Sequence, residues 1–381
     1  MYRGLALALF GALLVQDAPD PASEKATLHA DLAAASESVG DQLIKVKAWD
    51  EARAFLEMVR AKSDARGDAL DKLIAKTEKQ TSGLKWDAKP SELIKSFGAE
   101  RAKKFFAYAK AWKEKDAESS RWTEAEAEIL DDFLDYVKAY ARLTQIRAHY
   151  ELPKTRFDWK LSVPAVWHAK YLLLNPKDAR EVEGKPGFTL EGSATSEKAV
   201  SSSHESITDL VESILHAPFY RNYVLNGALH TIALGQGKGQ KSSSAIDVES
   251  GLTPFDSTYS MLHIPRNGST NVPLTGYDDY SPIFANKTMR QLGYPISLVF
   301  YDPTKRPSGV KARITENMKD VDFHISTPEN PVGTKITAGH RNTILLATKE
   351  PLRPGTEYKI SISFRDKGEE RIVEWSFRTT R

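Results

Sequence analysis

The spacing of apolar residues changes once along this 381-residue chain, and the change predicts two kinds of structure. Between Ser23 and Tyr150 apolar residues recur every three or four positions, which is typical of amphipathic helices. From Tyr294 onward they alternate with polar residues, as at Ile296, Leu298 and Phe300, which is typical of strands. We therefore expect an α+β protein with helices first and a C-terminal β-sandwich.

Composition narrows the class of protein further. With 41% hydrophobic and 27% charged residues the chain is ordinary globular protein, long enough for two or three domains. A net charge of +2 without a long basic run provides no electrostatic basis for binding nucleic acid. Cysteine is absent, which excludes disulfides, thiolate metal sites and thiol nucleophiles. The domains must rely on apolar cores.

Residues 1–18 differ from the rest and predict export. Arg3 supplies a positive flank, Leu5 to Val15 is apolar, and Ala18 offers a small residue at a cleavage site. The apolar run is too short to span a bilayer comfortably, so a secretory signal is expected rather than the alternative, an uncleaved anchor. We expect a secreted, periplasmic or cell-envelope protein with no transmembrane span beyond this segment.

A helical region is predicted over residues 19–120. Phe97, Phe105, Tyr108 and Trp112 form an aromatic stripe at helical spacing, which favours a packing face. Thr123 with Glu126 three residues later has the pattern of a capping box, and we expect it to open one long helix that runs to Leu143.

The stretch from residue 144 to residue 235 carries several landmarks in a fixed order. A helix end, Thr144-Gln145-Ile146-Arg147, is followed by Leu161-Ser162 and by Trp167-His168-Ala169-Lys170-Tyr171-Leu172. Then come Gly184-Lys185-Pro186-Gly187-Phe188-Thr189, the motif His216-Ala217-Pro218-Phe219-Tyr220-Arg221 and a strand-like segment ending at Gly235. This order resembles the bacterial branch of the CAP superfamily, the fold of cysteine-rich secretory proteins. Gly293-Tyr294-Pro295, where that branch has a similar sequence, adds to the resemblance. The resemblance implies a CAP-like α-β-α domain at residues 121–292, with a three-stranded sheet covered by helices on both faces.

The resemblance also implies a cavity that many CAP proteins line with two His and two Glu. Tyr220 replaces one of these histidines, and a neutral phenol is a poor substitute for an imidazole. Arg180-Glu181-Val182-Glu183 stands where the branch often has His-x-Glu, so the second histidine is missing too. The expected site is therefore degenerate.

Other residues are candidates for the same groove. The full set that we expect there is His168, Glu181, Glu183, His204, Glu205, His216, Tyr220 and Arg221. Ser203 is expected to be an N-cap that places Glu205 in the first turn of a helix, and the alternative makes His204 and Glu205 candidate metal ligands. His168, one helical turn after Pro164, is interpreted as a partly buried structural histidine.

Two other patterns do not predict catalysis. Ser201 to Ser203 beside His204 lacks the Gly-x-Ser-x-Gly elbow of a nucleophilic serine. The Gly-rich segment from Gly235 to Ser242 lacks the Gly that a P-loop has directly before Lys-Ser, so a surface hairpin is expected.

The last segment, residues 293–381, combines strand alternation with two signatures, one from Leu352 to Tyr358 and one from Trp375 to Thr379. These resemble a bacterial Ig-like domain, a class that usually serves as a spacer or adhesive module.

Two functions are expected from these observations. The first is a non-enzymatic extracytoplasmic module that binds a lipid, glycan or peptide and needs no cofactor. The alternative is a metal-dependent hydrolase, peptidase-like, in which His204, Glu205 and a carboxylate from Glu181, Glu183 or Glu191 converge on a divalent metal. A purely structural envelope protein is a third reading that the sequence does not separate from the first.

Overall fold

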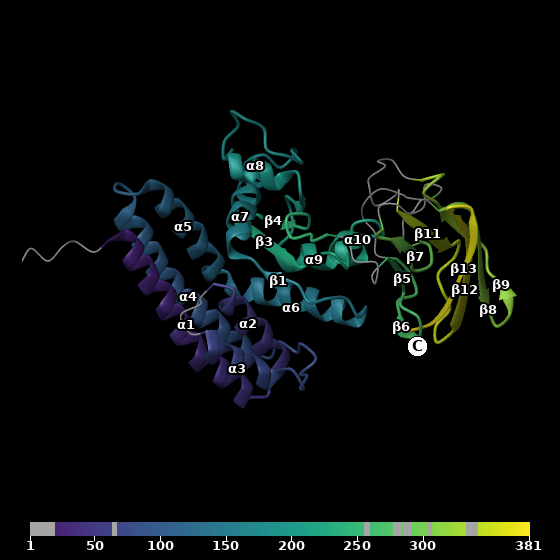
Figure 1. Ribbon diagram of the computed structural model, residues 1–381, viewed down its shortest axis with the longest axis horizontal. Coiled ribbons are helices and arrows are strands. Elements are labelled where there is room, and N and C mark those ends of the chain that lie inside the picture. The colour runs from purple at the N-terminus through teal and green to yellow at the C-terminus, as the bar shows by residue number, and fades with distance from the viewer. Residues whose placement is uncertain are drawn as a thin grey trace, which may run out of the picture.

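The computed structural model describes residues 20–62, 67–254, 260–276, 284, 291–302, 307–332 and 342–381. The molecule is elongated, with the N-terminal helices at one end, a central sheet between helices, and two further sheets at the C-terminal end (Figure 1). The expected α+β class is confirmed. The expected signal segment, residues 1–18, lies outside the described residues, and no helix within them has the length and apolar character needed to cross a membrane.

The described helices are α1 (Pro21–Lys45), α2 (Trp49–Arg60), α3 (Gly67–Thr77), α4 (Ala88–Trp112), α5 (Ala117–Asp131), α6 (Phe133–His149), α7 (Trp159–Leu174), α8 (Leu190–Ser196), α9 (Ile207–His216) and α10 (Arg221–Val224). The strands are β1 (Arg156–Phe157), β2 (Ala199–Ser202), β3 (Thr231–Lys238), β4 (Ser242–Asp247), β5 (Met261–Ile264), β6 (Ser269–Val272), β7 (Ile296–Phe300), β8 (Ser308–Glu316), β9 (Lys319–Asp320), β10 (Phe323–Ser326), β11 (Thr343–Thr348), β12 (Glu357–Asp366) and β13 (Glu369–Thr379).

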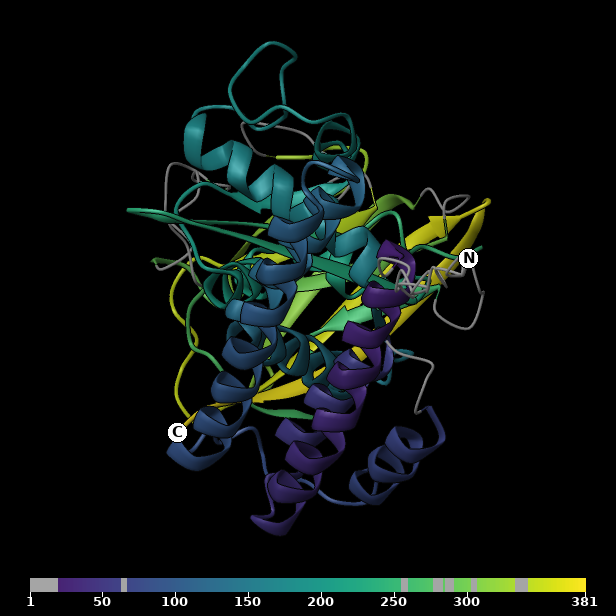
Figure 2. The ribbon, with the colours of Figure 1, turned by 90° about the vertical axis from the view of Figure 1, so that its left-hand side faces the viewer.

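The N-terminal helices share one apolar core with the central domain. Phe133 of α6 packs against Phe55 of α2 and Phe97 of α4, and the indole of Trp159 at the start of α7 donates to the carbonyl of Met58 at 2.8 Å. The predicted packing face of α4 is confirmed, because its four aromatic side chains are buried. Seen from the helical end, α1 to α5 lie in front of the strands (Figure 2).

The expected start of the central domain is wrong in its details. Helix α5 begins at Ala117, where the Asp116 side chain accepts from Ser119 N, so Thr123 lies inside the helix instead of capping it. The expected long helix is also interrupted, since α5 ends at Asp131 and α6 begins at Phe133. The border expected between residues 120 and 121 therefore falls within a helix.

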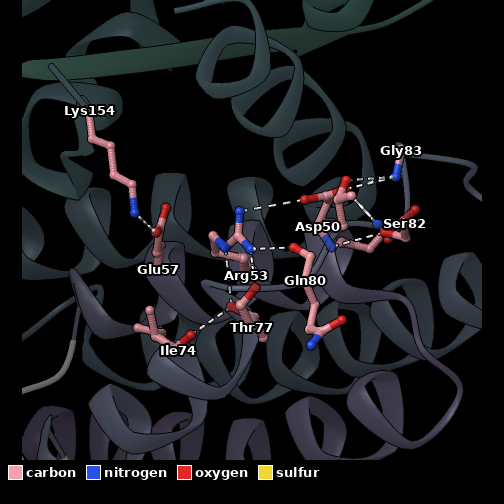
Figure 3. A network of polar contacts seen from close by, with 11 residues as sticks. Asp50, Arg53, Glu57, Ile74, Thr77, Gln80, Ser82, Gly83 and Lys154 are labelled. Atoms are coloured by element: carbon pink, nitrogen blue, oxygen red, sulfur yellow. Dashed lines mark hydrogen bonds and ion pairs between the residues drawn. The ribbon is translucent and has the colours of Figure 1, made fainter. Parts of the chain in front are cut away.

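A polar network fastens the chain after α3 to helix α2 (Figure 3). Asp50 accepts from the backbone N–H groups of Ser82 and Gly83, both at 2.8 Å. One turn later Arg53 donates to the carbonyls of Thr77 and Gln80 at the end of α3. These bonds hold the end of α3 and the turn that follows it against α2.

The central sheet has the strand order β1-β3-β4-β2, in which β1 is only two residues long. Helix α7 covers one face, and the segment that leads into α9 covers the other. The Ser243 hydroxyl of β4 donates to the Ala169 carbonyl of α7, and the Ser244 hydroxyl donates to the Glu205 carbonyl just before α9. Neighbouring residues of a strand point to opposite faces. The β3–β4 pairing confirms the hairpin expected for the Gly-rich segment from residue 235 to residue 242.

The C-terminal end is a β-sandwich. Its sheets have the orders β10-β11-β7-β5 and β6-β13-β12-β8-β9, and a shared core includes Leu298 and Leu346 from the first and Ile360 and Trp375 from the second. Strand β5 pairs with β7, and β6 pairs with β13. Residues 261–272 therefore belong to the sandwich. The sandwich begins before Met261 and not at residue 293, where the border was expected.

Candidate functional site

A cavity of about 550 Å³ lies at the β2 edge of the central sheet. Leu172 and the loop from Lys177 to Arg180 line it on the side of α7, whereas Leu210 and Ile214 line it on the side of α9. The β2 strand itself, from residue 199 to residue 202, also lines it. Because the cavity touches elements on both faces of the sheet, its floor is the sheet edge.

The lining combines apolar side chains with hydroxyl and charged groups. Its apolar part includes Val200 and Val248, and its aromatic groups are Tyr220 and Tyr223. Hydroxyl groups come from Ser196, Ser201, Ser202, Ser203 and Ser213. Largely apolar pockets with a few fixed polar groups are the usual form of ligand sites in proteins.

Glu205 is the one residue of this lining whose buried side-chain oxygen has no donor among the described residues. The hydroxyl of Ser213 donates to Oε1 of Glu205, while Oε2 is buried without a hydrogen-bond partner. His204 next to it is exposed, and its Nε2 lies 3.2 Å from the Ser203 hydroxyl. Buried polar atoms in proteins are nearly always paired, so the free oxygen marks a position for a donor from outside the chain.

The cap predicted at Ser203 is wrong. Helix α9 begins at Ile207, and the cap is Ser206, whose hydroxyl accepts from Asp209 N at 3.2 Å. Asp209 supplies the acid of the first turn. His204 and Glu205 precede the helix and are free to line the cavity instead of completing its first turn.

His168 and Glu181 form a separate buried pair that does not line the cavity. The Nδ1 atom of His168 lies 3.3 Å from Oε1 of Glu181, and both side chains have no solvent exposure. Oε2 of Glu181 accepts from Thr189 N at 2.9 Å. His168 is thus more deeply buried than expected, and with Glu181 it fastens the loop that follows α7.

The remaining acidic candidates lie apart from the cavity. Glu183 is exposed, and Glu191 accepts from Arg121 at 2.6 Å. Across the described ranges, no group of three or more His, Asp and Glu side chains is arranged to hold a metal ion. The convergence that the metal-dependent alternative requires is therefore missing from this part of the chain.

The motif from His216 to Arg221 splits between three environments. His216 is half-buried, with Nε2 3.8 Å from Glu212, and its burial lowers its pKa. Tyr220 is 45% exposed and lines the cavity. Arg221 points away from it, into the C-terminal sandwich, where it donates to the Pro295 carbonyl at 2.9 Å and to the Ser297 hydroxyl at 2.7 Å. Of the expected groove residues, the cavity brings together His204, Glu205 and Tyr220.

Several lining residues were missed by sequence reasoning. The segment from Ser196 to Ser202 contributes to the floor, and it shows no alternation of apolar and polar residues that would identify a strand. Tyr223 and Lys177 were missed as well. One feature of the sequence could have identified β2. The segment lies between two predicted helices, and a short segment in that position is often a strand of the central sheet.

A scan against protein-family models, a search of curated proteins and a search of solved structures each found no match to this chain.

Proposed function

We propose that this chain is an exported, non-enzymatic binding protein whose central cavity engages a ligand outside the cytoplasm. In this proposal the chain from α6 to about residue 260 forms a degenerate CAP-like domain, and the sandwich is an Ig-like spacer. The order of elements supports it, because α6 ends near Arg147, α7 carries His168 and β3 contains Gly235, as the resemblance implies.

The observation that carries the proposal is the unpartnered oxygen of Glu205 at a largely apolar cavity. A ligand with one N–H or O–H donor and an apolar body satisfies both features. The Ser213 hydroxyl holds the carboxylate of Glu205 through Oε1, so Oε2 is oriented before the ligand arrives.

Thermal unfolding tests the proposal with three defined probes, one for each ligand class. These are chitotriose, dihexanoyl phosphatidylcholine and the capped heptapeptide acetyl-Val-Thr-Val-Lys-Val-Thr-Val-amide. A ligand present at a hundred times its Kd stabilises a protein by about 2.7 kcal/mol. We expect at least one probe to raise the Tm of the protein and to be recovered unchanged by mass spectrometry.

A pair of variants locates the effect. Ala217 lines the cavity, so Ala217→Trp fills it, whereas Lys241→Trp places the same side chain on the exposed β3–β4 turn. We expect Ala217→Trp to abolish the probe-induced rise in Tm and Lys241→Trp to keep it. No rise with any probe, or a rise that survives in Ala217→Trp, would contradict the proposal. Chemical turnover of a probe would contradict its non-enzymatic part.

A further inference from the structure

The backbone of β2 has one free edge. Val248 N donates to the Lys198 carbonyl at 3.2 Å, so residues 198 and 248 are a hydrogen-bonded pair of the β2–β4 ladder. In an antiparallel ladder such pairs alternate with residues whose backbone groups point away from the partner strand. Val200 and Ser202 therefore bond to β4, and the N–H and C=O groups of Ala199 and Ser201 point outward.

These outward groups line the cavity instead of being covered. Among the described residues, neither Ala199 nor Ser201 has a hydrogen-bond partner on that side, and both lie in the cavity lining. The groups repeat every second residue, which is the spacing that a neighbouring strand matches. A glycan or a lipid does not offer donors and acceptors with that repeat.

We propose that the free edge of β2 binds an extended peptide segment as an added strand, with one basic side chain of the peptide reaching Glu205. This inference rests on the proposed binding function and names its ligand class. The main chain of the peptide bonds to residues 199 and 201, and its alternate side chains enter the two sides of the groove.

The walls of the groove favour a single chain over another sheet. The loop from Lys177 to Arg180 and the α9 side with Ser213 flank the edge on opposite faces. A second copy of this chain that paired through its own β2 would bring the same loop and the same α9 side against these walls. One extended segment fits between them.

The charges of the groove favour a basic side chain at Glu205. Arg180 is paired with Glu197 at 2.5 Å, and Asp178 with Lys185 at 2.7 Å. Burial and the neighbouring Asp247 raise the pKa of Glu249, and Lys198 is close enough to oppose them in part.

Of the remaining charged lining groups, Lys177 is exposed to water, whereas Glu205 has a buried oxygen without a donor. A lysine or arginine side chain from the peptide supplies the hydrogen-bond donor that Oε2 of Glu205 lacks.

Fluorescence anisotropy with a fluorescein-labelled form of the heptapeptide above tests the added strand. Ser201→Pro removes the serine hydroxyl and the outward N–H without breaking a bond to β4. Ser201→Ala removes only the hydroxyl and keeps the N–H. We expect Ser201→Pro to weaken binding at least about tenfold and Ser201→Ala to change it less than about twofold. Equal binding by both variants would overturn the inference.

Two N-methylated series of the heptapeptide keep the test decisive if Ser201→Pro fails to fold. The two series carry the methyl groups on opposite sets of alternate amides. N-methylation of alternate amides blocks hydrogen bonding on one edge of a peptide strand only. With the wild-type protein, one N-methylated series should lose binding and the other should keep it. Loss in both series, or in neither, would contradict pairing through one edge.

Glu205→Gln with two peptides tests the basic side chain. Relative to the wild-type protein, the variant should bind the lysine peptide about tenfold more weakly, and a peptide with norleucine in place of lysine about equally. Equal losses for both peptides would contradict the charge pairing.

Other outcomes separate this inference from the proposed function. If the heptapeptide does not bind while chitotriose or the phospholipid still raises the Tm through the cavity, added-strand binding is wrong and the binding function stands. Sedimentation velocity tests for a dimer. If the wild-type protein is a dimer and Ser201→Pro is a monomer, a second copy of the chain occupies the edge of β2 and the inference of a peptide ligand is wrong.

Discussion

The Nδ1 atom of His168 lies 3.3 Å from Oε1 of Glu181, and neither side chain is exposed to solvent. His168 belongs to α7, which packs on the central sheet, and Glu181 belongs to the loop that leads to α8. The same carboxylate accepts from Thr189 N. One acidic side chain therefore ties the middle of the loop next to the β2 groove to helix α7 and to the end of the loop at Thr189.

Replacement of Glu181 by alanine should destabilise the protein strongly. The change leaves Nδ1 of His168 and the N–H of Thr189 buried without their acceptor, and each buried polar group that is left unsatisfied costs about 1–3 kcal/mol. Urea unfolding should show this loss. Glu183→Ala, two residues away and exposed, should change the free energy of unfolding by less than about 0.5 kcal/mol. Similar values for the two variants would contradict the role of Glu181 as an anchor.

Gly235→Ala should prevent α7 from packing on β3. A Cβ atom at residue 235 would lie 2.1 Å from the backbone of Ala165, and backbone cannot move aside as a side chain can. We expect a loss of at least about 3 kcal/mol or failure to fold, measured by circular dichroism and urea unfolding. Gly239→Ala is the matched control, since its nearest atom would be 3.7 Å away, an ordinary contact. Equal stability of both variants would show that the helix is free to shift.

Sequence reasoning located elements that are defined by periodicity and missed those defined by tertiary contacts. The aromatic face of α4 and the hairpin at residues 235–242 follow from local patterns. Strand β2 does not, because four partly exposed residues carry no periodic signal and become a strand only through pairing with β4. The break at Asp132 was missed because the apolar spacing continues across it.

The candidate site was predictable only in part, for a similar reason. His204, Glu205 and Tyr220 were identified from residue type and from the family resemblance, and they do lie at one cavity. Arg221 was expected beside Tyr220, but consecutive residues at the start of a helix point in different directions. Its burial against Pro295 depends on a segment far along the chain, which no local pattern reports.

Arg221→Met should loosen the sandwich from the central domain. The guanidinium bonds to the Pro295 carbonyl and the Ser297 hydroxyl and lies 5.7 Å from the ring of Tyr294. Without the guanidinium these two acceptors stay buried and unpaired, at a cost of about 1–3 kcal/mol for each. Scanning calorimetry should show the sandwich unfolding at a lower temperature than the helical end. Arg180→Met, at an exposed position, should leave the unfolding transition of the sandwich unchanged. The same calorimetric trace for both variants would contradict the role of Arg221 in holding the sandwich to the central domain.

A buried ion cluster joins the helices at the N-terminal end. The Lys62 amino group lies 2.5 Å from Oε1 of Glu126, and His29 lies 3.7 Å from its other oxygen. Burial alone would raise the pKa of Glu126, but His29, Lys62 and Lys25 outweigh it and hold that pKa at about 2. Burial lowers the pKa of Lys62, and the attraction of Glu126 offsets only part of that effect.

Glu126→Gln should remove part of the acid sensitivity of the fold. The folded-state pKa, about 2, lies below the ordinary value of 4.5, so the ionised carboxylate stabilises the protein above pH 4.5. That contribution, on the order of 3 kcal/mol, is lost as the pH falls from 4.5 toward 2. Urea unfolding across this range should give a flatter curve for Glu126→Gln than for the wild-type protein. Glu118→Gln, exposed on the same helix, should follow the wild-type curve. Parallel curves for the wild-type protein and Glu126→Gln would mean that the cluster does not hold its charge in the folded state.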